Sequence, residues 1–372
     1  MKSTLTALLL ASTLAAGAQE QKAEPWYKTI KLSGYVMTQY QYDGKEGSEA
    51  NSFSLRMARL ALDGRIMGDF YWKAQLQVNG NTSSLGSSPR LVDAFAEWQK
   101  YKCFMVKAGQ FKRPFTFENP MHPIDQGFMS YSQNVTKLAG FNDRCGEQAS
   151  NGRDIGVQVQ GDFLPNARKR NLLHYQIGVY NGQGINTKDV DQQKDVIGGI
   201  WVMPVAGMRL GVFGSEGSYA RKGSWTDESG EHKGEVRKLP QHRYAISGEY
   251  KVSDWTFRSE YVHSTGKAFK VSESGGNGTT DCTVNEAIGS KADACYALVI
   301  APVISKKLYA KARYDLYRQS AEWGSSRTQY EAGFNYLFNK NVQLNAEYMR
   351  VNDRNLAKPN YNMIDVQLDF RF

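Results

Sequence analysis

Residues 361–372, the last twelve of the chain, read YNMIDVQLDFRF. From Ile364 to Phe372 every second residue is apolar, and the residues between them are Asp365, Gln367, Asp369 and Arg371. Successive side chains of a β-strand point to opposite faces of the sheet. The stretch therefore predicts a strand with one apolar face and one polar, largely charged face.

The same alternation recurs in three other segments: 68–80 (GDFYWKAQLQVNG), 242–252 (HRYAISGEYKV) and 306–319 (KKLYAKARYDLYRQ). The apolar faces of the four segments have twenty positions and none is charged, although 22% of the chain is charged and about four charges are expected by chance. A charge that faces lipid near the bilayer midplane costs about 2–4 kcal/mol, whereas a soluble sandwich tolerates an occasional one. The pattern indicates strands whose apolar faces contact lipid.

The connections between the predicted strands alternate in length. Short ones, such as 204–207 and 338–341, alternate with longer polar ones, such as 113–152, 217–241 and 265–292. The strands are predicted at 29–42, 52–63, 68–79, 91–99, 102–112, 153–162, 172–181, 195–203, 208–216, 242–252, 254–264, 293–304, 306–318, 327–338, 341–351 and 361–372. Such alternation with an even strand count is typical of barrels in outer membranes. The predicted fold is all-β: a transmembrane antiparallel β-barrel of about 16 strands, with short periplasmic turns and long external loops.

Residues 1–18, MKSTLTALLLASTLAAGA, have the features of a secretory signal peptide. Lys2 precedes an apolar run too short to span a bilayer, and Ala16-Gly17-Ala18 fits a cleavage site. After residue 18 no stretch approaches 18 consecutive apolar residues. We expect cleavage after Ala18, and residues 19–372 to form the barrel domain in the outer membrane of a Gram-negative-type bacterium.

The sequence contains no recognisable catalytic motif. A nucleophile elbow, a HExxH motif and a P-loop are missing, and none of the five His residues lies in a supportive motif. The four Cys residues lack zinc-site spacing, and the net charge of +9 is spread over interspersed acids and bases. We predict no enzyme activity, cofactor, metal or nucleic-acid partner. For Cys282 and Cys295 two alternatives stay open, a disulfide across one loop and thiols that fill space.

Several segments resemble one family in the same order along the chain. GQFKRPFTFE at 109–118, RDIGVQVQG at 153–161 and YQIGVYNGQGINTKDVD at 175–191 are similar to segments of the phosphate-selective porins O and P. The resemblance implies a sixteen-stranded, homotrimeric diffusion channel with one loop folded into the pore. Its partners would be outer-membrane lipid and small anions or other small solutes.

The connection at 113–152 is the longest and the third long one, the position of the constriction loop in porins. Its aromatic residues and its prolines at 114, 120 and 123 favour an ordered, packed segment. We expect it to fold into the pore; the alternative is an external cap.

Basic residues on the polar faces of the strands, or at the mouth of this connection, are the candidate pore-lining residues. They are Arg59, Lys73, Lys107, Lys112, Arg113, Arg243, Lys251, Arg258, Lys311 and Arg313, with Arg371 on the last strand. A line of fixed cations in a narrow pore selects anions. Eleven acids share these faces, however, so the charges nearly cancel, and many are expected to pair across the wall, as in Lys311, Arg313 and Asp315 beside Glu331. An anion or phosphate preference therefore follows from the resemblance and not from the charge count.

The alternative function is a sugar- or peptide-selective uptake pore, or a surface-exposed binding barrel. Four aromatic residues on the polar faces, Tyr71, Phe95, Tyr309 and Tyr317, could form a track for sugars.

Overall fold

The computed structural model describes residues 25–47, 50–79, 89–147, 150–270 and 280–372. The predicted signal peptide lies outside these residues. None of the described helices is long and apolar enough to cross a membrane.

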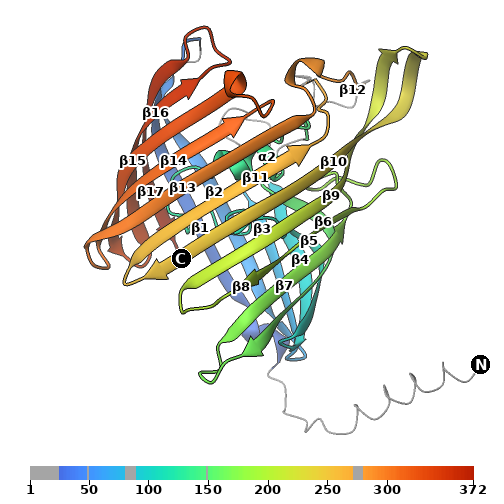
Figure 1. Cartoon of the computed structure of the whole chain (residues 1–372). Coiled ribbons are helices and arrows are strands. Elements are labelled where there is room, and N and C mark those ends of the chain that lie inside the picture. The colour runs from blue at the N-terminus through green and yellow to red at the C-terminus, as the bar shows by residue number, and fades with distance from the viewer. Residues whose placement is uncertain (1–24, 48–49, 80–88, 148–149, 271–279) are drawn as a thin grey trace, which may run out of the picture.

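Within the described residues, sixteen antiparallel strands form a closed barrel (Figure 1). The strands are β1 (Lys31–Asp43), β2 (Ala50–Ile66), β3 (Phe70–Gln77), β4 (Arg90–Tyr101), β5 (Phe104–Lys112), β6 (Arg153–Pro165), β7 (Asn171–Tyr180), β8 (Asp195–Val202), β9 (Met208–Asp227), β10 (Gly230–Val252), β11 (Trp255–Thr265), β13 (Lys291–Ile304), β14 (Leu308–Arg318), β15 (Ser326–Asn339), β16 (Val342–Asp353) and β17 (Asn360–Arg371). The last strand pairs with the first, from Tyr35↔Arg371 to Asp43↔Met363, which closes the sheet. Lipid offers no hydrogen-bond partner to an open strand edge, so closure satisfies the backbone. The predicted fold is confirmed.

Four short helices and one short strand are not part of the wall. They are η2 (Trp26–Thr29), α2 (Gln133–Leu138), η3 (Glu286–Ile288), η4 (Trp323–Ser325) and β12 (Thr280–Asp281).

The two faces of the barrel have the polarity that the sequence predicts. On β17, Ile364 and Phe370 are each 41% exposed, whereas Asp365 and Asp369 are each 1% exposed. Apolar side chains outside and buried charges inside are the reverse of a soluble protein. The outer face is therefore the surface that contacts lipid, and the polar face lines the lumen.

The segment 217–241 differs from its prediction as a loop. β9 and β10 stay paired from Met208↔Tyr250 to Asp227↔Gly230, so this segment forms a hairpin that projects beyond the barrel (Figure 1). Its side chains have their own apolar contacts, which a floppy loop would lack. Tyr219, Trp225, Leu239, Phe269, Val284, Cys145 and Cys282 form one buried cluster, hereafter the external cluster.

Candidate functional site

The segment between β5 and β6, residues 113–152, is hereafter the long connection. Its helix α2 packs against β11, β13 and β14, and lies within the outline of the barrel in Figure 1. Phe117 lies 5.3 Å from the ring of Phe213 on β9, centroid to centroid, and is 2% exposed. Met129 and Leu138 are 0% exposed. The described part of the long connection therefore packs on the inner face of the wall.

Carboxylates on the wall accept hydrogen bonds from backbone amides of the long connection. Glu260 on β11 accepts from the amides of Phe117 at 2.9 Å and of Glu118 at 3.0 Å. Asp315 on β14 accepts from Gln133, and Glu347 on β16 from Met129, at 2.9 and 2.7 Å. A buried backbone amide without a partner costs free energy, so these acids act as anchors for the segment.

Cations on the wall bind carbonyl oxygens of the same segment. The Lys112 ammonium donates to the carbonyls of Asn119 and Met121, both at 2.6 Å. Arg258 donates to Gln126, Lys311 to Gly127, and Arg243 to Leu138, at 2.6, 3.1 and 2.8 Å. Part of the predicted pore charge is thus used to hold the long connection.

Seven of the ten predicted site residues also form ion pairs. The pairs are Lys107 with Glu97, Arg113 with Glu147 and Asp154, Arg243 with Asp143, Lys251 and Arg258 with Glu249, Lys311 with Glu347, and Arg313 with Glu331. Lys311 pairs with Glu347 on β16 and not with Glu331, while Asp315 binds the long connection.

The remaining three predicted residues, Arg59, Lys73 and Lys112, form no ion pair with any described carboxylate. Arg59 donates to the amide oxygen of Gln77 at 2.9 and 3.0 Å, and its Nη1 has no partner among the described residues. The three lie on β2, β3 and β5, so they share one part of the wall.

His122 of the long connection lies near these three cations, a relation that the sequence did not predict. Its ring contacts that of Tyr35 on β1, with centroids 4.6 Å apart. Burial, together with charge repulsion from Lys73, Arg59 and Lys112, lowers the pKa of His122 to about 3. The three cations therefore give this part of the wall a positive potential that acts on His122.

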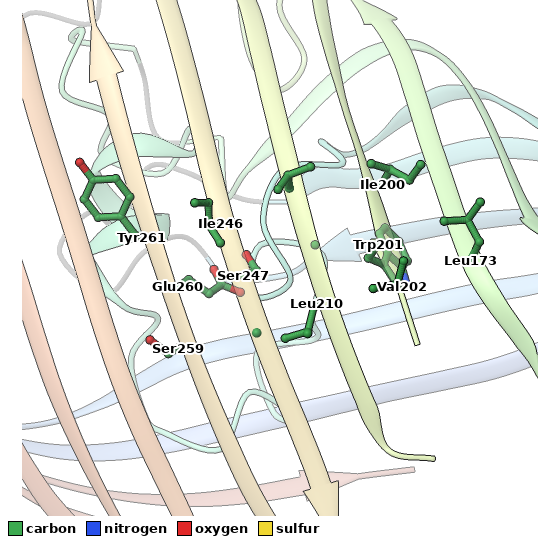
Figure 2. Close-up of a pocket in the computed structure, with 13 residues that line it drawn as sticks. Leu173, Ile200, Trp201, Val202, Leu210, Ile246, Ser247, Ser259, Glu260 and Tyr261 are labelled. Carbon is green, nitrogen blue, oxygen red and sulfur yellow. The ribbon is translucent and has the colours of Figure 1, made fainter. Parts of the chain in front are cut away.

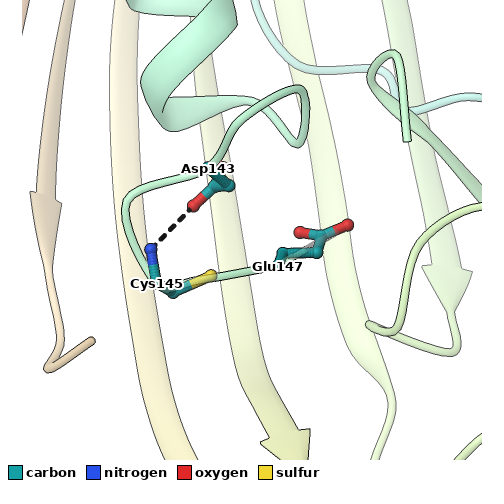
Figure 3. Close-up of side chains that lie close together, drawn as sticks. All are labelled: Asp143, Cys145 and Glu147. Carbon is teal, nitrogen blue, oxygen red and sulfur yellow. Dashed lines mark hydrogen bonds between the residues drawn. The ribbon is translucent and has the colours of Figure 1, made fainter. Parts of the chain in front are cut away.

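Three polar side chains lie close together where the long connection meets the external cluster. Ligand atoms of Asp143, Cys145 and Glu147 are within 4.8 Å of one another (Figure 3). Both carboxylates already bind guanidinium groups: Asp143 that of Arg243 at 2.7 Å, and Glu147 that of Arg113 at 2.7 Å. Guanidinium cations thus occupy the place that a metal ion would take, and the cluster is an ion-pair network.

Cys282 and Cys295, the two cysteines of the possible disulfide, lie in different parts of the protein. Cys295 is on β13, opposite Tyr261 and Leu316 in the sheet, and is a free thiol. Cys282 belongs to the external cluster. The alternative of a disulfide between them does not fit this arrangement, because Cys295 lies in the wall and Cys282 in the external cluster.

Two arginines that sequence reasoning missed also take part in the lumen. Arg153 binds Asp93 of β4, with Nε 2.6 Å from a carboxylate oxygen. Arg56 donates to the side chain of Gln367 at 2.7 Å. The sequence offered a signal only for Arg153, which begins the RDIG segment that resembles a family motif.

A hollow of about 780 Å³ lies on the outer wall over β7–β11 (Figure 2). Ile200, Leu210 and Ile246, which line it, are between 45% and 58% exposed on the apolar face. The hollow therefore belongs to the lipid-facing surface and not to the solute path.

The closed barrel and its charged lumen define the class of protein, and comparisons with known proteins agree. Residues 30–177 match the family model of the phosphate-selective porins O and P. The predicted resemblance is confirmed over these residues. The family match over these residues and the fold together support an outer-membrane porin channel.

Solved structures show the same fold at low identity. The anion-selective porin from Comamonas acidovorans has a TM-score of 0.64 and 12% identity, over 92% of this chain and 99% of that one. Salmonella typhi OmpF in complex with daunomycin has a TM-score of 0.61 and 13% identity, over 92% and 97%. The outer-membrane channel DcaP of Acinetobacter baumannii has a TM-score of 0.60 and 13% identity, over 92% and 97%. A search of curated proteins found no match.

Proposed function

We propose that the protein is a homotrimeric diffusion channel of the outer membrane that prefers small anions, with phosphate among them. The observation that carries this proposal is an asymmetry of the lumen. Glu260 and Asp315 bind the long connection, and Asp93 and Glu331 bind guanidinium groups, whereas Arg59 and Lys73 form no ion pair with a described carboxylate.

The number of acids and bases on the polar faces nearly cancels, so the ion preference depends on which of these charges are already paired. A carboxylate held by a guanidinium or by two backbone amides has little potential left for a passing cation. An unpaired ammonium or guanidinium keeps its potential, and in a narrow pore it replaces part of an anion's hydration shell. Permeating anions are therefore expected to follow the wall formed by β2 and β3.

The long connection is proposed to narrow this path. It packs on the opposite strands, β11, β13 and β14, through α2. His122 extends toward Tyr35 and the cationic wall. The constriction would then lie between His122 and the side chains of Arg59 and Lys73.

Two relatives support the selectivity and the oligomer. The Comamonas acidovorans structure is described as an anion-selective porin, and OmpT of Vibrio cholerae has a structure described as a trimer form. Both share the fold at 12–13% identity, so the selectivity and the trimer of this chain are proposals.

The test is the reversal potential of the reconstituted protein in a planar bilayer with a KCl gradient. The wild type is expected to prefer chloride, and Arg59→Gln with Lys73→Met to shift the potential toward zero. Lys251→Met is the matched control, because that ammonium is 3.5 Å from Glu249 and its side chain is 55% exposed. Cation selectivity of the wild type would contradict the proposal. Current block by phosphate tests the finer preference.

The alternative of a sugar track loses its continuity. Tyr71 and Phe95 are in ring contact, with centroids 6.1 Å apart. Tyr309 and Tyr317 lie eight residues apart on β14, and Tyr317 is 7% exposed within the cluster that includes the long connection. The four rings therefore form no single surface for a neutral sugar.

A further inference from the structure

Three aromatic side chains form a continuous group on the inner face of β3, β4 and β5. Tyr71 and Phe95 have centroids 6.1 Å apart, and Phe95 and Phe111 have centroids 5.9 Å apart. Phe95 lies opposite Gly109 in the β4–β5 pair. Tyr71 and Phe95 are partly exposed, whereas Phe111 is 4% exposed. These three rings are hereafter the aromatic platform.

Two ammonium groups lie beside the aromatic platform. The Nζ atom of Lys107 is 5.1 Å from the ring centre of Phe95 and 5.4 Å from that of Phe111. Lys73 lies directly opposite Phe95 in the β3–β4 pair. A cation held over a ring face stays next to apolar surface instead of extending into water. Charge and aromatic surface are thus adjacent on the same part of the wall.

The carboxylates near these two ammonium groups also interact with other side chains. Asp63, opposite Lys73 in the β2–β3 pair, interacts with the phenol of Tyr71. Glu97 is 3.7 Å from Lys107 and also accepts hydrogen bonds from the side chains of Gln99 and Gln160. Lys73 forms no ion pair with a described residue, so it is available to an anion that enters the lumen.

This combination suits one class of solute. An inorganic anion gains from the ammonium groups but gains nothing from partly exposed rings, which interrupt its hydration. A neutral sugar can stack on the rings but leaves the ammonium groups without a counter-charge. An aromatic carboxylate uses both, because its ring can pack on aromatic side chains while its carboxylate meets a cation.

We propose that the aromatic platform with Lys73 and Lys107 binds aromatic monocarboxylates during their passage. The ring would rest against Tyr71 and Phe95, and the carboxylate would lie between the two ammonium groups. This inference rests on the proposed anion preference and names the solute class within it. The binding must be weak for conduction, and the partial exposure of the rings fits weak contact.

The experiment measures the block of chloride current through the reconstituted full-length mature protein in a planar bilayer. Benzoate is compared with cyclohexanecarboxylate, which has the same charge and nearly the same size but no aromatic ring, and with acetate. The half-blocking concentration of benzoate is expected to be about fivefold lower than that of cyclohexanecarboxylate, the ratio that an aromatic pair contributes. Acetate is expected to be weaker than both.

Variants assign the effect to the site. Phe95→Leu keeps an apolar side chain and is expected to remove the difference between benzoate and cyclohexanecarboxylate. Lys73→Met is expected to weaken the block by both ring acids. Phe257→Leu is the matched control on the lipid face, where Phe257 is 41% exposed. Each variant must show the gel migration of a folded barrel, unheated and heated, before its currents are compared.

The outcomes separate the two proposals. Equal block by benzoate and cyclohexanecarboxylate, in a channel that still prefers chloride over potassium, overturns the aromatic-anion inference alone. A benzoate preference that survives Phe95→Leu overturns the assigned site. A channel without chloride preference in the KCl gradient overturns the proposed function instead, and that measurement needs no benzoate.

Discussion

Arg243 and Asp143 are a buried pair that joins the wall to the long connection. Their side chains are 7% and 0% exposed, and Arg243 donates to Asp143 at 2.7 and 2.8 Å. Burial raises the pKa of the Asp143 carboxyl, but the charge and hydrogen bonds of Arg243 lower it by more, so the pKa lies below its ordinary value. Each group is thus needed to offset the desolvation of the other.

Arg243→Met is therefore expected to lower the free energy of unfolding by about 3–5 kcal/mol, because it leaves the Asp143 carboxylate buried without its cation. The measurement is urea unfolding of the detergent-folded protein, followed by gel migration. Lys251→Met, at an exposed side chain on the same strand, is the control and should change stability by less than about 1 kcal/mol. A similar loss in both variants would contradict the role of the pair.

His122 gives a second residue-scale prediction, on pH. Its folded pKa, about 3, lies below the unfolded value of 6.5, so the unfolded chain binds the proton more readily. The stability that this group contributes is complete above pH 6.5 and is lost as pH falls toward 3. At pH 4 the loss is about 3 kcal/mol, from about 2.5 pH units at 1.36 kcal/mol each.

The measurement compares unfolding of the wild type and His122→Gln at pH 7 and pH 4. The comparison also cancels the contribution of Glu147 to stability. Burial raises the pKa of Glu147 to about 7, so its contribution is lost as pH rises, in the opposite direction to that of His122. The difference between wild type and variant isolates His122. If the wild type and the variant lose the same stability on acidification, protonation of His122 does not destabilise the fold and the prediction is wrong.

At the scale of elements, the anchoring of the long connection depends on acceptors and not on charge. Glu260 accepts from the amides of Phe117 and Glu118 through one oxygen. Glu260→Gln keeps an acceptor oxygen there, whereas Glu260→Met removes it and leaves two buried amides without a partner. We expect the Met variant to show a higher and noisier single-channel conductance, and the Gln variant to resemble the wild type.

Single-channel recording in a planar bilayer distinguishes these cases. A steady wild-type conductance in the Met variant would mean that the long connection holds its place without Glu260. An equal rise in both variants would mean that the carboxylate charge, and not the acceptor, matters.

The elements also show which parts of the fold the sequence determines. Period-two alternation and the alternating connection lengths together predicted the sixteen wall strands, because a charge on the lipid face is costly and water fills the other side. The same reasoning failed for 217–241, where polar side chains on both faces conceal a paired hairpin. Its buried residues contact the external cluster, which includes residues from distant segments, and no local pattern predicts such contacts.

The candidate site divides in the same way. Strand parity alone located Arg59, Lys73 and Lys311 on the polar face. It did not predict the partners of the residues on that face. Asp315, for example, binds Gln133, and the path of the long connection determines that contact. That path depends on contacts with β11, β13 and β14 together, which no single strand's sequence contains.

At the scale of the whole molecule, the barrel depends on the seam between β1 and β17. Gly34 and Phe372 exchange two backbone hydrogen bonds, both 3.0 Å long. A Cβ atom at Gly34 would lie 2.5 Å from the ring of Phe372 and 2.7 Å from the carbonyl oxygen of Arg59. Backbone on one side cannot move without disturbing β2, so the seam requires a glycine here.

Gly34→Val is therefore expected to impair closure, although valine favours strands in general. Gly214→Val is the matched control, since a Cβ atom at Gly214 meets no atom within 4 Å. Refolding into detergent, scored by the fraction of protein whose migration changes on heating, should fall sharply for Gly34→Val and stay near wild type for Gly214→Val. An open seam in lipid would leave backbone groups unpaired and prevent folding. Equal folding of the two variants would therefore show that the barrel can close without the close contact between Gly34 and Phe372.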